Sequence, residues 1–144
     1  AVAGVMAALV AVSVALVATR GTDADDGEGT CTTSAETCRE RVARNLGRPL
    51  LWPTDVRFVA ASFDTTANVI HFEGREGRRL AIHVRRVETP SMGAKDAPRL
   101  FDSDPPQAAF DHDGLRYVLI PDRPPGSSNS DIADWLREVI AAMG

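Results

Sequence analysis

The chain has 144 residues, of which 44% are hydrophobic and 25% are charged, and its formal net charge is −4. These proportions are typical of a folded domain and exclude a disordered chain, and the length leaves room for a single domain. An acidic chain lacks the basic surface that binds nucleic-acid phosphates, so we predict no nucleic-acid partner. Arginine supplies 15 of the 16 basic residues, a usage typical of bacterial genomes rich in G and C.

Residues 1–19 form an apolar segment. No charged residue occurs between Ala1 and Ala18. A helix of this length spans about 27 Å, enough to cross the hydrocarbon core of a bilayer. We therefore predict a single-pass transmembrane anchor over residues 1–19. The alternative is a cleaved signal peptide, for which Ser13 and Ala15 offer a cleavage site between small residues.

Small residues recur every four positions on one side of this predicted helix, namely Ala3, Ala7, Ala11 and Ala15. Small side chains let membrane helices approach closely, so this face is predicted to pack against other membrane-protein subunits. The alternative is that an alanine-rich composition produces the pattern without any partner.

The segment after the apolar run is acidic. Residues 20–32 contain four acidic residues and one arginine, and we predict a flexible tether there. Because the basic flank of a cytoplasmic loop is missing, we expect the chain beyond it to lie on the extracytoplasmic side of the cell membrane.

Cys31 and Cys38 are the only cysteines. Such a lone pair near a membrane segment predicts a disulfide made in an oxidising compartment.

Residues 33–144 are predicted to fold as one extracytoplasmic domain that begins with a helix. The run Thr33–Glu36 has the form of a capping box, in which the first and last side chains satisfy amides at a helix start. Apolar residues then recur at spacings of three and four, which predicts a helix over about 34–46 that ends at Gly47.

Runs of β-forming residues predict about five strands, over 56–63, 69–73, 79–85, 108–112 and 115–120. In the hairpin 69–85 we place Phe72 opposite Leu80, because this register gathers the apolar residues on one face. The same register sets Glu73 opposite Arg79, an oppositely charged pair.

Asp113 and Gly114 form the strongest hairpin signal in the chain. A two-residue turn there pairs Phe110 with Tyr117 on one face of the sheet and Asp111 with Arg116 on the other. Before this hairpin, residues 88–107 hold four prolines and are predicted to be a long irregular loop, with Arg99–Phe101 as a candidate interruption.

After the hairpin, residues 128–131 supply a second capping sequence before an apolar stripe that predicts the last helix. The fold class that results is α+β: an N-terminal transmembrane helix followed by one antiparallel sheet of about five strands flanked by two helices.

Histidines and acidic residues are the candidates for metal binding. His71 and His83 lie on the outer face of the predicted hairpin, within reach of a shared ion. Such a site needs a third ligand, which Glu73 or another chain would have to provide. Four acidic residues could surround Ca²⁺ but lack the regular spacing of a calcium loop: Asp102, Asp104, Asp111 and Asp113. We predict no metal site and no cofactor.

Catalytic motifs are also missing from the sequence. His112 lies between Asp111 and Asp113 in the manner of an oriented general base. Structural roles explain these two carboxylates better, because Asp113 belongs to the predicted turn and Asp111 lies opposite Arg116. The sequence has no Gly-x-Ser-x-Gly and no glycine-rich phosphate loop, and the predicted disulfide leaves no free cysteine. We therefore predict no catalytic residue and no enzyme activity.

Arginines gather on the predicted hairpin: Arg75, Arg78, Arg79, Arg85 and Arg86. They are candidates for contact with anionic headgroups or with an acidic partner. The alternative is that they are ordinary solvated side chains of exposed strands.

These features favour a membrane-anchored extracytoplasmic accessory or interaction domain, a non-catalytic subunit of a larger bacterial membrane complex. The alternative is a ligand- or signal-sensing domain of a single-pass regulator. The order of apolar helix, tether and α+β domain resembles the extracytoplasmic halves of membrane-bound anti-sigma factors, and this resemblance implies a cytoplasmic domain before Ala1. A metal-assisted hydrolase that uses His71, His83 or His112 ranks third.

Overall fold

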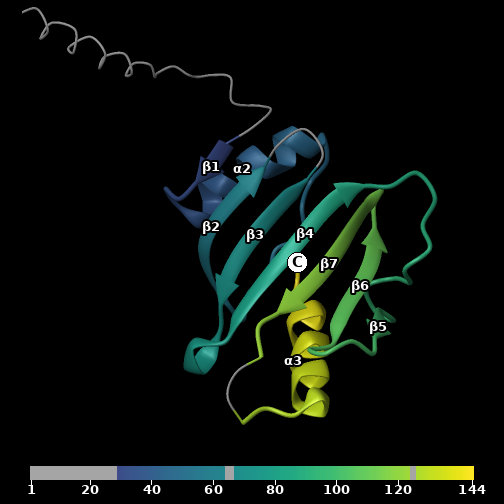
Figure 1. The fold of residues 1–144 in the computed structure, drawn as a ribbon. Helices are drawn as coiled ribbons and strands as arrows, with labels where there is room; N and C mark the ends of the chain where they lie inside the picture. The colour runs from purple at the N-terminus through teal and green to yellow at the C-terminus, as the bar shows by residue number, and fades with distance from the viewer. Residues whose placement is uncertain (1–28, 64–66, 124–125) are drawn as a thin grey trace, which may run out of the picture.

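The structure is a computed structural model that describes residues 29–63, 67–123 and 126–144 (Figure 1). Within these ranges, seven strands form one antiparallel sheet in the order β1-β2-β3-β4-β7-β6-β5. The α+β class is confirmed, but the prediction of about five strands is wrong. The two additional strands are β1 and β5, which have three residues each.

The strands are β1 (Gly29–Cys31), β2 (Arg57–Phe63), β3 (Asn68–Glu73), β4 (Arg79–Arg86), β5 (Arg99–Phe101), β6 (Gln107–His112) and β7 (Leu115–Pro121). The helices are α2 (Ala35–Leu46), α3 (Asn129–Ala141) and the short 3-10 helix η2 (Arg75–Gly77). β1 includes residues expected in the tether, because their backbone pairs with the end of β2.

Both α-helices pack on the same face of the sheet. The buried stripe of α2 and that of α3 belong to one core together with the inward side chains of β2, β3, β4, β6 and β7. In Figure 1, α2 lies against the β1 and β2 end of the sheet and α3 lies near β6 and β7. The molecule is therefore a two-layer sandwich in which the helices cover one side of the sheet.

The predicted strand registers are confirmed. Phe72 lies opposite Leu80 in the β3–β4 hairpin, so the alternating apolar residues all face the helices. Phe110 lies opposite Tyr117 across the β6–β7 turn, and their rings stack with centroids 4.8 Å apart.

The start of α2 differs from the predicted capping box. Ser34, not Thr33, is the N-cap residue, and its hydroxyl accepts a hydrogen bond from the backbone N–H of Thr37 at 3.1 Å. Thr33 instead lies beside the sulfur atoms of a disulfide. The helix ends at Gly47 as predicted.

The segment between α2 and β2 forms the wall of the core between the two helices. The backbones of Trp52 and Gly144 exchange two hydrogen bonds of 3.0 Å, which join this segment to the residues after α3. The backbone N–H of Leu51 donates to the hydroxyl of Tyr117 at 2.9 Å. This hydrogen bond connects the segment between α2 and β2 to β7, in the middle of the sheet.

Candidate functional site

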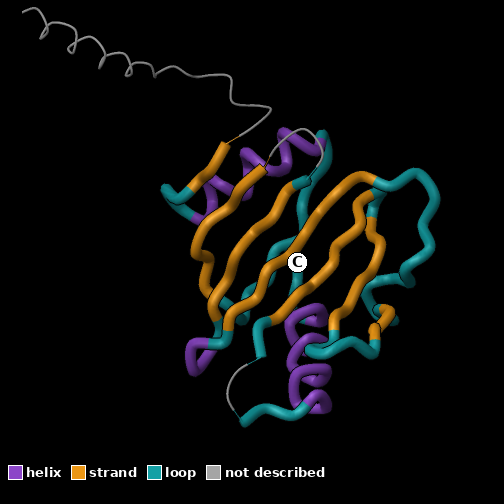
Figure 2. Tube along the Cα trace, in the orientation of Figure 1, coloured by secondary structure: helices purple, strands orange, loops and turns teal. Residues whose placement is uncertain are grey.

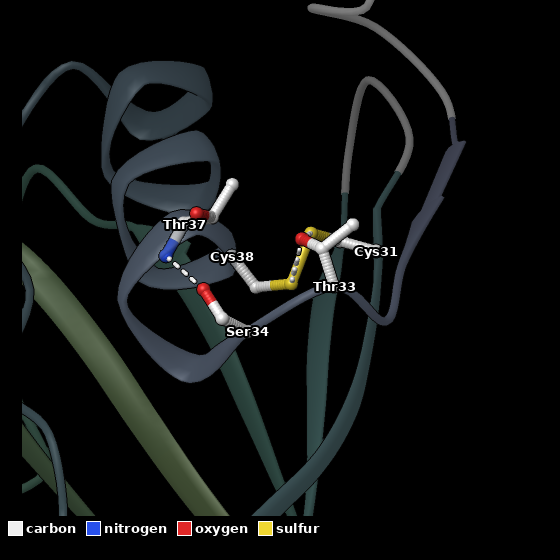
Figure 3. The surroundings of a disulfide bond; sticks show 5 residues. All are labelled: Cys31, Thr33, Ser34, Thr37 and Cys38. Atoms are coloured by element: carbon white, nitrogen blue, oxygen red, sulfur yellow. Dashed lines mark hydrogen bonds between the residues drawn. A yellow bond between two sulfur atoms is a disulfide. The ribbon is translucent and has the colours of Figure 1, made fainter.

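Cys31 and Cys38 form the predicted disulfide, which joins the end of β1 to α2 (Figure 3). Their Cα atoms are 5.6 Å apart, and both residues are buried. Because disulfides form and persist in oxidising compartments, this bond indicates an oxidising, extracytoplasmic environment.

The predicted membrane segment lies outside the described residues, and so do Ala3, Ala7, Ala11 and Ala15. Within the described ranges, no helix is long and apolar enough to cross a membrane. The anchor and its packing face therefore stay predictions.

The side of the sheet opposite the helices is the main candidate for a binding surface. We call the part of this side formed by β2, β3, β4 and β7 the open face. Its centre consists of two cross-strand rows, one made of Ala60, His71, Ala81 and Ile120 and the other made of Ser62, Val69, His83 and Val118. Except for the two histidines, these side chains are small or apolar and only half buried.

A hollow of about 540 Å³ lies over the first of these rows. It forms where Ala60 and Ala81 flank His71, because their side chains are too short to fill the surface. Val59, at the irregularity in the β2–β3 pairing, borders the hollow and is 45% exposed. The open face therefore has a concave floor in which small and half-buried aliphatic side chains surround His71.

Charged side chains border this floor at both ends of β4. Glu73 lies opposite Arg79 as predicted, but its carboxylate pairs with Arg57 on β2. Arg79 and Arg85, six positions apart on β4, have no ion-pair partner among the described residues. Two cations without an ion-pair partner therefore flank these rows, and the carboxylate of Asp122 also lines the hollow.

His71 and His83 share the open face in diagonal positions, because His71 lies opposite Ala81 and Val69 lies opposite His83. Within the described ranges, no group of three or more His, Cys, Asp or Glu side chains is close enough to hold a metal ion. Partial burial, and then the charge of His71, lowers the pKa of His83. The lowered pKa favours the uncharged form of His83 at neutral pH.

Asp111 is engaged in structure and does not orient His112. The carboxylate accepts hydrogen bonds from the guanidinium of Arg116 at 2.8 and 3.1 Å, which confirms the predicted pair. It also accepts the backbone N–H groups of Ser91 and Met92 at 2.6 and 2.9 Å. The loop between β4 and β5, which descends on the β6 side of the sheet in Figure 2, is thereby fastened to β6. The contact of Asp111 with the β4–β5 loop was not expected from the sequence.

The arginines of the β3–β4 hairpin do not form one cluster. Arg75 and Arg78 lie at the turn between the strands, whereas Arg85 and Arg86 lie at the opposite end of β4. The latter two, together with Arg48, line a second pocket of about 660 Å³. Sequence analysis missed Arg48, because only the fold brings the residue after α2 beside the end of β4.

Comparison with protein-family models, with curated proteins and with solved structures found no match to this chain.

Proposed function

We propose that this chain is a membrane-anchored, extracytoplasmic accessory domain, a non-catalytic subunit that binds another subunit of a bacterial membrane complex through its open face. The observation that carries the proposal is the one-sided sheet. Helices and the segment between them cover one face, while the opposite face presents small and half-buried aliphatic side chains around a hollow. Apolar surface of this kind is stabilised when a partner removes it from water.

The charges around the floor indicate the chemistry of the partner. Arg79 and Arg85 flank the apolar rows, and six residues of strand separate them by about 20 Å. A complementary surface is an apolar strip with a carboxylate near each end. Opposite charges at the rim favour the correct register and the rate of association, while burial of the apolar strip supplies most of the affinity.

Two further features support placement beside a membrane. The disulfide indicates an extracytoplasmic environment, and the apolar run 1–19 has the composition and length of a membrane-spanning helix. An anchored domain meets membrane partners at high effective concentration, so a modest open-face contact is sufficient for stable assembly.

The test is a pair of matched substitutions in the full chain, purified from its native membranes in mild detergent. Ala81→Arg places a long charged side chain in the middle of the open face, whereas Ala94→Arg makes the same change at an exposed position of the β4–β5 loop. We expect wild type and Ala94→Arg to retain the same membrane subunits in fixed proportion, and Ala81→Arg to lose them. Retention by a folded Ala81→Arg protein would contradict the proposal.

The hollow over Ala60 and Ala81 favours one second candidate, a domain that senses a small ligand. Its volume of about 540 Å³ falls within the range of about 300–1,000 Å³ that is usual for ligand pockets. Native mass spectrometry of the purified full chain separates the two functions. A bound small molecule with no protein subunit would favour sensing, and a bound subunit would favour the accessory role.

A further inference from the structure

The second pocket lies at the end of the sheet where the described chain begins. Gly29 pairs with Phe63, Phe63 with Asn68, and Asn68 with Val84, so one cross-strand row leads from the first described residue to the end of β4. Arg85 and Arg86 follow directly in the chain. Figure 1 shows β1, α2 and this end of β4 at the same end of the molecule.

Three arginines line this pocket from two separate segments. Arg48 follows α2, and Arg85 and Arg86 end β4. Arg48 fits here because the β6–β7 turn has a glycine below it: a Cβ on Gly114 would lie 2.9 Å from Nε of Arg48. The backbone of the turn therefore forms a close-fitting support for this guanidinium.

The positive charge of the pocket is not balanced within the described residues. Glu88 is the only carboxylate that lines it, and none of the three arginines takes part in an ion pair of the described chain. Other arginines of the fold, such as Arg57 and Arg116, are paired. Unpaired guanidinium groups around one cavity are suited to bidentate hydrogen bonding of a phosphate group.

We propose that this pocket binds the phosphate of anionic lipid headgroups at the membrane surface, and the proposal rests on the membrane anchoring proposed above. Nine residues, 20–28, separate the apolar segment from Gly29, and nine extended residues reach at most about 30 Å. The end of the domain that carries the three arginines is therefore held near the bilayer. Headgroup binding orients the sheet and leaves Arg79 and the central rows of the open face available to a neighbouring subunit.

The test uses the full chain in lipid nanodiscs of phosphatidylcholine, with and without phosphatidylglycerol. Hydrogen exchange is measured at the backbone amides of residues 45–48 and 85–88. We expect slower exchange at both segments only when phosphatidylglycerol is present. The protection should fall about fivefold in Arg86→Ala, because one arginine near an anionic surface changes binding by about that factor. Arg75→Ala, at the other end of the same hairpin, is the matched control and should keep the protection.

Each remaining outcome overturns the proposal in a distinguishable way. If the chain stays in the discs but exchange does not respond to phosphatidylglycerol, the lipid site is wrong and the anchoring stands. If the chain does not stay with lipid, the anchoring itself fails. Protection by inorganic phosphate in phosphatidylcholine discs, with no effect of phosphatidylglycerol, would assign the pocket to a free phosphate. Protection in phosphatidylcholine alone that disappears when the acidic residues of 20–28 are neutralised would assign it to the tether.

Discussion

Asp111, on β6, links three parts of the fold through one side chain. Its side chain is 5% exposed, and it joins β7 through Arg116 and the β4–β5 loop through two backbone amides. The guanidinium of Arg116, which donates to the carboxylate, is the main cause that holds the pKa of Asp111 at about 2, below the ordinary 3.8. The backbone N–H groups of Met92 and Ser91 lower the pKa further, and burial opposes them.

We expect Asp111→Asn to lower the free energy of unfolding by about 2 kcal/mol at neutral pH, because it leaves Arg116 buried without its counter-ion. Urea unfolding measures the loss. Asp134→Asn is the control, since Asp134 pairs with Arg137 on the exposed side of α3. Such an exposed pair contributes less than about 0.5 kcal/mol. Equal losses in the two variants would contradict this account of Asp111.

The same carboxylate predicts a pH dependence of stability. A carboxylate with a lowered pKa stabilises the folded state fully above the pKa of the unfolded chain and loses this contribution as the pH falls through the folded value. For Asp111 the range runs from the ordinary 3.8 down to about 2. The stability difference between wild type and Asp111→Asn should therefore shrink between about pH 5 and pH 2. A difference that stays constant across this range would rule out Asp111 as its source.

Among the elements, the β4–β5 loop depends most on one backbone position. Gly93 has a φ of 84°, and its carbonyl accepts the backbone N–H of Asp111 at 2.8 Å. A Cβ at Gly93 would lie 2.5 Å from the carbonyl oxygen of Ala97. The loop therefore tolerates no side chain at this point.

Gly93→Ala should destabilise the protein by more than about 2 kcal/mol, because backbone strain and a clash with backbone add together. Gly126→Ala separates the two effects. Gly126 has a similar φ of 79° but no atom within 4 Å of the added Cβ, so only the strain of about 1 kcal/mol applies. Thermal unfolding of both variants measures the difference. Equal shifts would mean that the loop moves to make room.

On the scale of the whole molecule, the disulfide joins β1, at the edge of the sheet, to α2, in the helical layer. Cys31 and Cys38 are seven positions apart, and closing so short a loop stabilises a fold by about 2–3 kcal/mol. We expect the double variant Cys31→Ser, Cys38→Ser to lose this amount in urea unfolding. A reducing agent should produce the same loss in the wild type and none in the variant. An unchanged wild type after verified reduction would contradict the prediction.

The parts of this fold that could be predicted are those specified by local sequence. The Asp113–Gly114 turn determines the register of its hairpin, because a two-residue turn allows only one pairing of the two strands. The apolar stripes of α2 and α3 specify helices in the same local way. Arg99–Phe101 forms a strand only because β6 lies beside it. Glu73 pairs with Arg57 because β2 lies beside β3 in the sheet, and no local sequence pattern indicates that these two strands are neighbours.

The candidate surfaces were harder to predict than the elements. Alternation along β3 and β4 separates an apolar face from a polar face, but it does not reveal whether the helices cover one side of the sheet or both. The hollow depends on Ala60 and Ala81 lying on either side of His71, a juxtaposition across three strands. The basic pocket joins Arg48 to Arg86 across 38 positions of sequence, a distance at which no local pattern operates.

The short outer strands have a consequence for self-association. An exposed sheet edge recruits strands from neighbouring copies of a protein, and short edge strands limit this recruitment. β1 and β5 form the two edges with three residues each. A neighbouring copy of the chain therefore finds only a short strand to pair with at either edge, and fibril-like growth of the sheet is discouraged.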